Sequence, residues 1–328
     1  MKAFVTGATG FVGSHLVDRL LEEGYEVYCL KRKTSNTRWL EGKNIHYVNG
    51  DLYSNDVLEK TIKDMDYVFH VAGVLKSKKK EGYKIGNNLA TKNLIEITFK
   101  VKPDLKKFVH ISSLSVCGPT PGEKSIDENY IPKPITNYGI TKYKAEQEVL
   151  KYRDRLPVII IRPPAVFGPR DTEILVYFQT FSKGLNSVIG LKEKYLSLIY
   201  IEDLIDGIML AAEKPNNSGE IYFVSSDKAY NWNEIGNITS KLLGKKAIKI
   251  KIPHSVVFGV GYIAQFFSTF SKNAATLNVE KCKDITRERW VCTNKKAKDE
   301  LGFIEKHTLE ESFAKTIDWY KKNNWIKN

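Results

Sequence analysis

An alternation of short apolar runs with helical stretches in the first half of the chain constrains the fold more than any other feature. The runs lie at residues 2–6, 26–30, 46–49, 67–72, 107–112 and 158–162. Between the first two, Val12, Leu16 and Leu20 share one stripe of a helix. Continuously apolar strands separated by amphipathic helices are typical of a parallel sheet that helices cover on both faces. We therefore predict an α/β fold with a doubly wound parallel sheet.

A glycine-rich turn follows the first predicted strand. Gly7, Gly10 and Gly13 come directly after Thr6, and the first predicted helix opens within this segment. Glycines here permit a tight turn and let a pyrophosphate approach backbone N–H groups at the helix N-terminus. A strand before the turn and a helix after it supply the context that such a loop requires. The segment therefore predicts a dinucleotide-binding site.

The regular alternation ends after the sixth predicted strand. A segment rich in Gly and Pro at 167–171 opens a different region, although the apolar runs 196–201 and 221–224 have the character of further strands. We expect residues 1–168, with return segments near 196–228, to form the dinucleotide-binding domain. Residues 169–195 and 229–328 then form a smaller, mostly helical, substrate-binding part.

Composition and charge exclude several classes of protein. With 42% hydrophobic and 27% charged residues, the chain has the composition of a globular protein rather than a disordered one. Its net charge of +13 favours anionic partners, but no zinc-finger, RRM-like or helix-turn-helix pattern indicates nucleic acid. Four cysteines without a CxxC pair predict neither disulfides nor a metal site. Because no apolar run reaches the ~20 residues of a spanning helix and no signal peptide is evident, we expect a cytoplasmic protein.

Further marks downstream make the sequence resemble a known superfamily. The glycine spacing is GxxGxxG, and Tyr138 and Lys142 form a Tyr-x-x-x-Lys pair. The accompanying segments are Asp51-Leu52, Val71-Ala72-Gly73, 87–94, 112–118, Arg162-Pro163 and Phe167-Gly168-Pro169. Over about residues 1 to 228, the chain resembles the extended, epimerase/dehydratase-like branch of the short-chain dehydrogenase/reductase superfamily. It departs from that pattern at Ala90 and Cys117, where glycine and tyrosine are commoner.

The resemblance implies a Rossmann sheet, an NAD or NADP cofactor, a small-molecule substrate and a homodimer through the helices that begin near Asn87 and Tyr138. The implied cofactor-binding residues are Gly7, Thr9, Gly10, Phe11, Val12, Gly13, Lys31, Arg32, Asp51, Leu52, Val71, Ala72, Gly73, Tyr138, Lys142, Pro163 and Val166. The implied catalytic residues are Ser113, Tyr138, Lys142 and Asn87.

The chemistry of the Tyr-x-x-x-Lys pair explains its spacing. On a helix Tyr138 and Lys142 are i and i+4 and share a face. A nearby ammonium, with the positive charge of an oxidised nicotinamide, lowers the pKa of a phenol from ~10 toward neutrality. Tyr138 can then exchange a proton with a substrate oxygen while hydride moves to or from the cofactor. Ser113 falls where a hydroxyl hydrogen-bonds that oxygen; Ser112 and Ser115 compete for this role, and register with Gly118 favours Ser113.

The end of the second predicted strand indicates which cofactor is preferred. NAD-binding proteins place an acid there to accept hydrogen bonds from the ribose, whereas a 2′-phosphate requires arginine or lysine. Here Lys31 and Arg32 follow Cys29-Leu30 and no acid is present. We therefore favour NADP, with NAD as the alternative.

Within the resemblance, the reaction stays open between two classes. Leu114-Ser115 stands where sugar-nucleotide dehydratases carry Asp-Glu, and residues 162–168 lack the asparagine usual in nucleotide-sugar epimerases. The Lys-Arg-x-Thr-Ser run at 31–35 and the Pro-Pro-Ala-Val-Phe-Gly-Pro segment at 163–169 instead resemble the dihydroflavonol reductase and 3β-hydroxysteroid dehydrogenase-like branch. We expect an NAD(P)-dependent oxidoreductase acting on a carbonyl or secondary alcohol of an apolar or acyl-linked molecule. A redox-neutral, NAD-dependent nucleotide-sugar epimerase is the alternative.

Two further segments have more than one interpretation. Residues 252–270 are rich in bulky apolar side chains and fit a substrate pocket, a buried helix or peripheral contact with a membrane surface. The lysine-rich residues 75–84 follow the fourth predicted strand and fit either a solvated loop or a site for an anionic group. His70 and His110 lie in predicted core strands, where we expect them to be interior packing residues.

Overall fold

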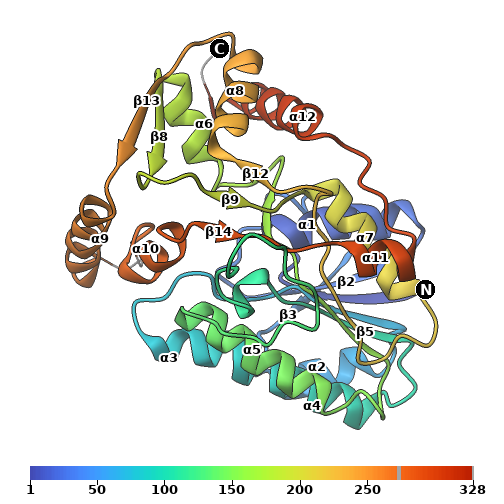
Figure 1. The fold of residues 1–328 in the computed structure, drawn as a ribbon. Helices are drawn as coiled ribbons and strands as arrows, with labels where there is room; N and C mark the ends of the chain where they lie inside the picture. The colour runs from blue at the N-terminus through green and yellow to red at the C-terminus, as the bar shows by residue number, and fades with distance from the viewer. Residues whose placement is uncertain (272–274, 327–328) are drawn as a thin grey trace.

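The computed structural model describes residues 1–271 and 275–326. A parallel sheet lies at its centre (Figure 1). The sheet has seven strands in the order β11-β6-β5-β4-β1-β2-β3. The strands are β1 (Lys2–Thr6), β2 (Glu26–Lys31), β3 (His46–Asn49), β4 (Tyr67–His70), β5 (Lys107–Ile111), β6 (Val158–Ile161) and β11 (Ile221–Tyr222). The predicted doubly wound parallel sheet is confirmed, and the predicted strands in residues 1–162 agree with the observed ones to within two residues at each end.

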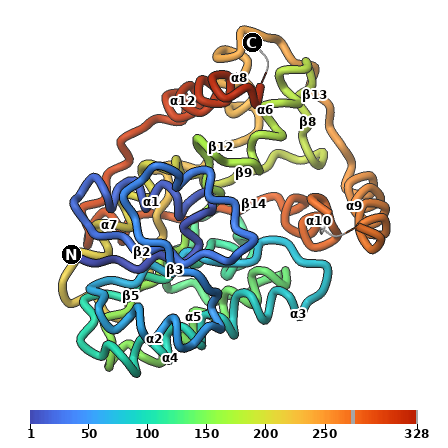
Figure 2. The backbone as a smooth tube through the Cα atoms, turned by 180° about the vertical axis from the view of Figure 1, so that it is seen from behind, coloured from blue at the N-terminus to red at the C-terminus, as the bar shows by residue number. Residues whose placement is uncertain are grey.

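Helices cover both faces of this sheet (Figures 1 and 2). One layer contains α1 (Phe11–Glu22), α7 (Ile201–Glu213) and α11 (Lys295–Leu301), and the other contains α2 (Asn55–Ile62), α4 (Ala90–Val101) and α5 (Asn137–Leu150). Successive residues of β1 point to opposite faces, so Val5 belongs to the core under α1 and Phe4 to the core under α4. This double burial explains why the strands are apolar throughout rather than alternating.

The remaining elements form smaller units beside the sheet. Strands pair as β7 (Ala165–Phe167) with β10 (Leu198–Tyr200), β8 (Leu185–Ile189) with β13 (Ile248–Ile252), and β9 (Tyr195–Leu196) with both β12 (Tyr230–Asn231) and β14 (Arg289–Trp290). The other helices are α3 (Lys80–Tyr83), η1 (Lys84–Leu89), η2 (Leu114–Val116), α6 (Leu175–Ser182), α8 (Trp232–Leu243), α9 (His254–Thr269), α10 (Val279–Ile285) and α12 (Leu309–Lys322). Of the two later apolar runs, 221–224 contributes β11 to the large sheet, whereas 196–201 contributes β10, which pairs with β7.

The apolar segment at 252–270 forms a helix that lies on the surface. Within α9 only Val257 and Gly261 are buried, so a buried C-terminal helix is the wrong interpretation of this segment. In both views α9 stands at the edge of the molecule (Figures 1 and 2). None of the helices in the described residues combines the length and apolarity needed to cross a bilayer.

Candidate active site

The glycine-rich turn adopts the geometry of an anion-binding loop. Gly7 has a φ of +72°, and a Cβ added there would lie 2.7 Å from the Ala72 nitrogen. A Cβ on Gly13 would lie 2.2 Å from the Gly7 oxygen. Gly10 caps α1 without a side-chain hydrogen bond, and the first turn of α1 holds no acidic residue. The turn therefore presents free helix N–H groups with no Cβ in the way, which fits a pyrophosphate.

The segment after β4 lies directly against this turn. Val71 donates its backbone N–H to the Thr6 oxygen at 3.2 Å, and Ala72 donates to Thr6 Oγ1 at 3.3 Å. A Cβ on Gly73 would contact Asn87 Oδ1 at 3.4 Å. The structure thus brings together three groups of residues that the sequence analysis singled out separately.

Asn87 joins two parts of the site from its position in η1, a π-helix. Its Oδ1 accepts from the Val74 nitrogen at 2.6 Å, and its Nδ2 donates to the Val74 oxygen at 3.2 Å and to Thr141 Oγ1 at 3.1 Å. The side chain is 1% exposed. Asn87 therefore holds the loop after β4 against α5, in keeping with the frequent occurrence of π-helical turns at functional sites.

Ser113 and Tyr138 meet at the carboxyl edge of the sheet. Thr136 caps α5 through a hydrogen bond from the Gly139 nitrogen at 3.1 Å, which places Tyr138 in the first turn of the helix. Burial raises the pKa of Tyr138 to about 12, and a hydrogen bond with the Ser113 side chain acts in the opposite direction. The Ser113 hydroxyl also accepts from the Ser115 nitrogen at 3.1 Å, an ST turn that fixes its direction.

Lys142 points from α5 toward β5. Its Nζ donates to the Ile111 oxygen at 2.6 Å and lies 3.4 Å from His110 Nε2. Burial lowers the pKa of Lys142 to about 8, opposed by the negative charge of Glu146. Without a cofactor, burial is the largest cause that raises the pKa of Tyr138, and Lys142 Nζ donates to the Ile111 oxygen. The lowering of the phenol pKa by Lys142 together with an oxidised nicotinamide stays a prediction.

The two core histidines lie side by side beneath Lys142. His70 and His110 are paired in register on β4 and β5, fully buried, with ring centroids 5.2 Å apart. His70 Nε2 lies 2.8 Å from Thr91 Oγ1, whose own proton goes to the Asn87 oxygen, so we assign the His70 proton to Nε2. Burial lowers the pKa of His70 to about 3 and that of His110 well below its usual value. Both are interior residues, as predicted, but among the described residues His110 Nδ1 has no hydrogen-bond partner.

A buried ion pair anchors α5 to the sheet. Arg162, at the end of β6, donates from Nε and Nη2 to Glu146 Oε1 and Oε2 at 2.9 and 2.6 Å, and the two side chains are 3% and 0% exposed. Next to it, the Pro163 oxygen accepts from the Leu114 nitrogen at 2.8 Å, which ties η2 to this strand end. Val166 follows in β7 and is half-buried.

The residues that end β2 and follow β3 lie at the surface of the protein. Lys31 is half-buried with its Nζ 5.2 Å from the centre of the Tyr47 ring, and the Arg32 side chain is exposed. Asp51, after β3, is exposed and its Oδ1 accepts from the Tyr53 nitrogen at 2.9 Å, whereas Leu52 packs on the core. These residues border the same sheet edge as the glycine turn, where ligands of parallel α/β sheets bind.

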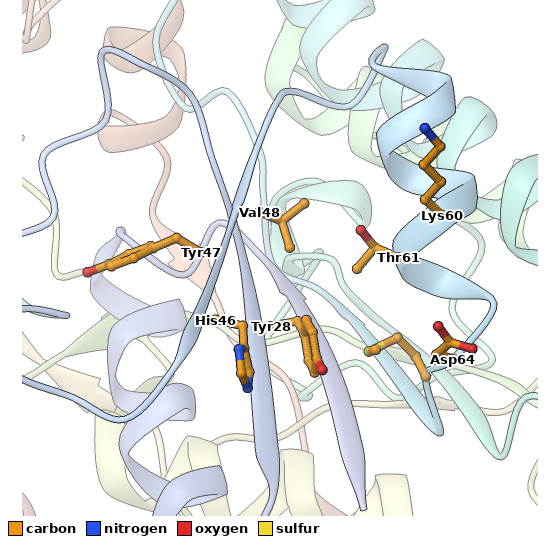
Figure 3. A pocket seen from close by; sticks show the side chains of 8 residues that line it. Tyr28, His46, Tyr47, Val48, Lys60, Thr61 and Asp64 are labelled. Carbon is orange, nitrogen blue, oxygen red and sulfur yellow. The ribbon is translucent and has the colours of Figure 1, made fainter.

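A separate hollow lies near the opposite end of these strands. It has a volume of about 320 Å³ and is lined by Tyr28, His46, Tyr47, Val48, Lys60, Thr61, Asp64 and Met65 (Figure 3). His46 begins β3 and Met65 comes just before β4, so the hollow lies toward the amino ends of the strands. It is therefore not part of the site at the carboxyl edge.

Two site residues lacked a sequence signal. Asp284, on α10, acts electrostatically on Tyr138, and burial raises the pKa of Asp284 to about 6. Arg170 donates to Ser14 Oγ at 3.1 Å and to Asp18 Oδ2 at 2.8 Å, which fastens the segment after β7 to α1. Only the chain fold brings these residues to the site, since each is more than 140 positions from its partner.

Comparisons with known proteins agree with this geometry. Residues 3–225 match the family model described as "NAD dependent epimerase/dehydratase family". The chain is 25% identical to ceramide reductase of Caulobacter vibrioides, covering 98% of this chain and 95% of that protein. It is 26% identical to the decarboxylating sterol-4-alpha-carboxylate 3-dehydrogenase of Candida albicans, covering 98% of each.

A solved structure extends the comparison to an epimerase. UDP-glucuronic acid 4-epimerase from Bacillus cereus, in complex with UDP-glucuronic acid and NAD, superposes with a TM-score of 0.80 and 25% identity over 98% of this chain and 100% of that one. The similar proteins thus include a reductase, a dehydrogenase and an epimerase. Since the family model covers more than half of the chain and the glycine turn fits a dinucleotide, this protein is an NAD(P)-dependent enzyme of the NAD-dependent epimerase/dehydratase family.

Proposed function

We propose that the protein is an NAD(P)-dependent oxidoreductase that interconverts a carbonyl and a secondary alcohol on an apolar or acyl-linked small molecule. The observation that carries this proposal is the packing of the turn that holds Ser113 against the first turn of α5, which holds Tyr138: a Cβ on Gly139 would lie 2.4 Å from the Ser115 oxygen. In the reducing direction, the substrate carbon gains a hydride and its oxygen gains a proton. Bound cofactor supplies or accepts the hydride.

The side chains of this site have separable roles. With a pKa of about 12, Tyr138 keeps its proton at neutral pH and donates it to the carbonyl oxygen. Ser113 donates a hydrogen bond to the same oxygen as negative charge develops there. Lys142 would contact the cofactor and help to return a proton to Tyr138, and Asn87 positions α5 through Thr141. The glycine turn, with the segment Val71-Ala72-Gly73, would hold the pyrophosphate and adjoining parts of the cofactor.

Two observations favour an oxidoreductase over an epimerase. The residues from Arg162 to Gly168 offer no asparagine for a substrate diphosphate. Ceramide reductase and the sterol dehydrogenase are named for lipid substrates, which fits an apolar or acyl-linked molecule. The alternative, a redox-neutral nucleotide-sugar epimerase, is supported by the likeness to the Bacillus cereus enzyme.

The exposed Arg32, with Lys31 beside it, supports a preference for NADP, because a guanidinium that no acid neutralises can bind a 2′-phosphate. We test this by titrating the cofactor-free protein with NADPH and NADH. We expect NADPH to bind at least about tenfold more tightly, and Arg32→Ser to remove this preference. The neighbouring exposed Lys33→Ser is the matched control. Tighter binding of NADH would contradict the NADP assignment without affecting the oxidoreductase proposal.

The reaction itself is tested with aliphatic and sterol ketones under NADPH, and with UDP-glucose under NAD. We expect oxidation of NADPH with an apolar ketone, and a loss of at least about 100-fold in turnover for Tyr138→Phe with cofactor binding retained. Epimerisation of UDP-glucose without net change of cofactor would overturn the proposal. A homodimer through α4 and α5 belongs to the same proposal and is checked by sedimentation velocity.

A further inference from the structure

The outer face of α9 is apolar, and its large side chains stay exposed among residues 1–271 and 275–326, which the structure describes. One stripe at helical spacing consists of Val256, Val260, Ile263, Phe267 and Phe270, each at least 49% exposed. Tyr262 and Phe266 form a second stripe beside it, both 61% exposed. The segment from His254 to Thr269 contains no Asp, Glu, Lys or Arg. Such a continuous apolar surface is uncommon on a protein exposed only to water.

The inner face of α9 is fixed to the rest of the protein, so the outer face is held outward. A Cβ on Gly261 would lie 2.4 Å from Cys282 Sγ on α10, and that thiol donates to the Val257 oxygen at 3.4 Å. α10 in turn reaches the site, because Glu280 Oε2 accepts from the Asn137 nitrogen at 2.6 Å. The apolar stripes are therefore a stable feature of the surface and lie on the far side of α10 from the candidate site.

Positive charge borders this face at both ends. Between Glu234 and Glu280 the sequence contains no Asp or Glu. Before α9, Lys249 donates to Asn233 Oδ1 and Lys251 donates to the Leu191 oxygen at 3.0 Å, so neither contact neutralises its charge. At the other end of the helix, Lys78 donates to the Ser271 oxygen, which places the lysine-rich segment 78–80 beside the apolar stripes.

We propose that α9 docks peripherally on the surface of an anionic lipid bilayer, with its aromatic and aliphatic stripes in the interface and the lysines against the headgroups. An apolar helix face bordered by cations has this affinity by burial of apolar area and by attraction to anionic lipid. A second copy of the chain fits less well, since a two-fold contact through α9 brings the lysines of both copies together. If α9 lies on a bilayer, only α10 separates the lipid from the start of α5, where Tyr138 lies. Delivery of an apolar substrate from the lipid rests on the proposed function, whereas the docking itself does not.

The test is cosedimentation of the full-length protein with two kinds of vesicle. One is phosphatidylcholine alone, and the other contains about 30 mol% phosphatidylglycerol, which makes its surface anionic. We expect binding to the anionic vesicles that weakens as salt is raised. Phe267→Asp should reduce the partition coefficient at least about tenfold. Ile304→Asp is the matched control, because Ile304 is 68% exposed, as Phe267 is 65% exposed, and lies outside α9.

The charge contribution has its own control. Lys249→Ser/Lys251→Ser should weaken binding to anionic vesicles, and Lys321→Ser/Lys322→Ser on α12 should not.

Absence of sedimentation with either vesicle, or equal effects of the two Asp substitutions, would overturn the proposal. A Phe267→Asp variant that loses only a dimer seen by sedimentation velocity would assign the face to a second copy instead. None of these readouts requires a substrate, so their failure is distinct from failure of the proposed oxidoreductase activity.

Discussion

The ion pair between Arg162 and Glu146 gives the sharpest test of how α5 is held in place. Both side chains are almost fully buried, and two short hydrogen bonds of 2.9 and 2.6 Å join them. In Glu146→Gln one amide N–H₂ replaces an acceptor, so a guanidinium N–H faces another donor and a buried charge loses its counter-ion. Breaking a buried pair in this way costs about 3–5 kcal/mol. With a guanidinium slope of about 5 kcal/mol/M, the midpoint of unfolding should fall by about 0.6–1 M.

The same helix supplies a matched control. Glu148 pairs with Lys151 at 2.7 Å, but the lysine side chain is 60% exposed, so Glu148→Gln should cost less than about 0.5 kcal/mol. Unfolding is followed by tryptophan fluorescence and by circular dichroism, and coincident curves are required before the midpoints are compared. The double variant Arg162→Met/Glu146→Leu should recover much of the loss, because no unpaired charge remains. Equal midpoints for Glu146→Gln and Glu148→Gln would refute this reasoning.

Three other predictions concern the site. Gly13→Ala should weaken NAD(P) binding at least about tenfold in a fluorescence titration, because its Cβ would lie 2.2 Å from the Gly7 oxygen, whereas Gly259→Ala, with open space, should have no effect. Equal NAD(P) affinities for Gly13→Ala and Gly259→Ala would contradict the proposal that the glycine turn holds the pyrophosphate. Asp284→Asn should raise the unfolding midpoint at pH 8 and leave it unchanged at pH 3.5. Burial raises the pKa of Asp284 to about 6, so the ionised carboxylate destabilises the native state above that pH. An unchanged midpoint at pH 8 would contradict the raised pKa of Asp284. Asn87→Ala should cost about 2 kcal/mol in guanidinium unfolding, since it leaves buried partners unsatisfied; lost activity at unchanged stability would instead indicate direct contact with a reacting group.

Much of the sheet and the cofactor turn followed from the sequence because their signals are local. The apolar runs of the first half became strands with nearly the predicted ends, since a strand buried on both faces needs continuous apolar residues. Gly7 and Gly13 were recognisable because only glycine tolerates the positive φ at one and the 2.2 Å approach at the other. The spacing of Tyr138 and Lys142 likewise predicted a shared helix, which α5 provides.

The direction of individual side chains did not follow from that spacing. The i, i+4 relation predicted a shared helix face for Tyr138 and Lys142, but it did not indicate that Lys142 Nζ would donate to the Ile111 oxygen. Which groups surround an ammonium depends on the strand packed beneath the helix, and that strand is distant in sequence. The preference for Ser113 over Ser112 and Ser115 rested on register with Gly118, and it stays a prediction.

The sequence by itself determined the positions of the strands in the first half, the glycine turn and the residue types that can bind a dinucleotide, because each depends on a few neighbouring residues. Only the tertiary structure decided that Asp284 acts on Tyr138 from 146 positions away, and that Arg170 fastens the second part of the chain to α1. It also decided the exposure of α9, since an apolar run has the same periodicity whether its outer face meets a protein core or the surroundings. Long-range contacts and burial arise from packing between helices and strands. The hydrophobic periodicity of a single segment does not specify which other helices and strands it packs against.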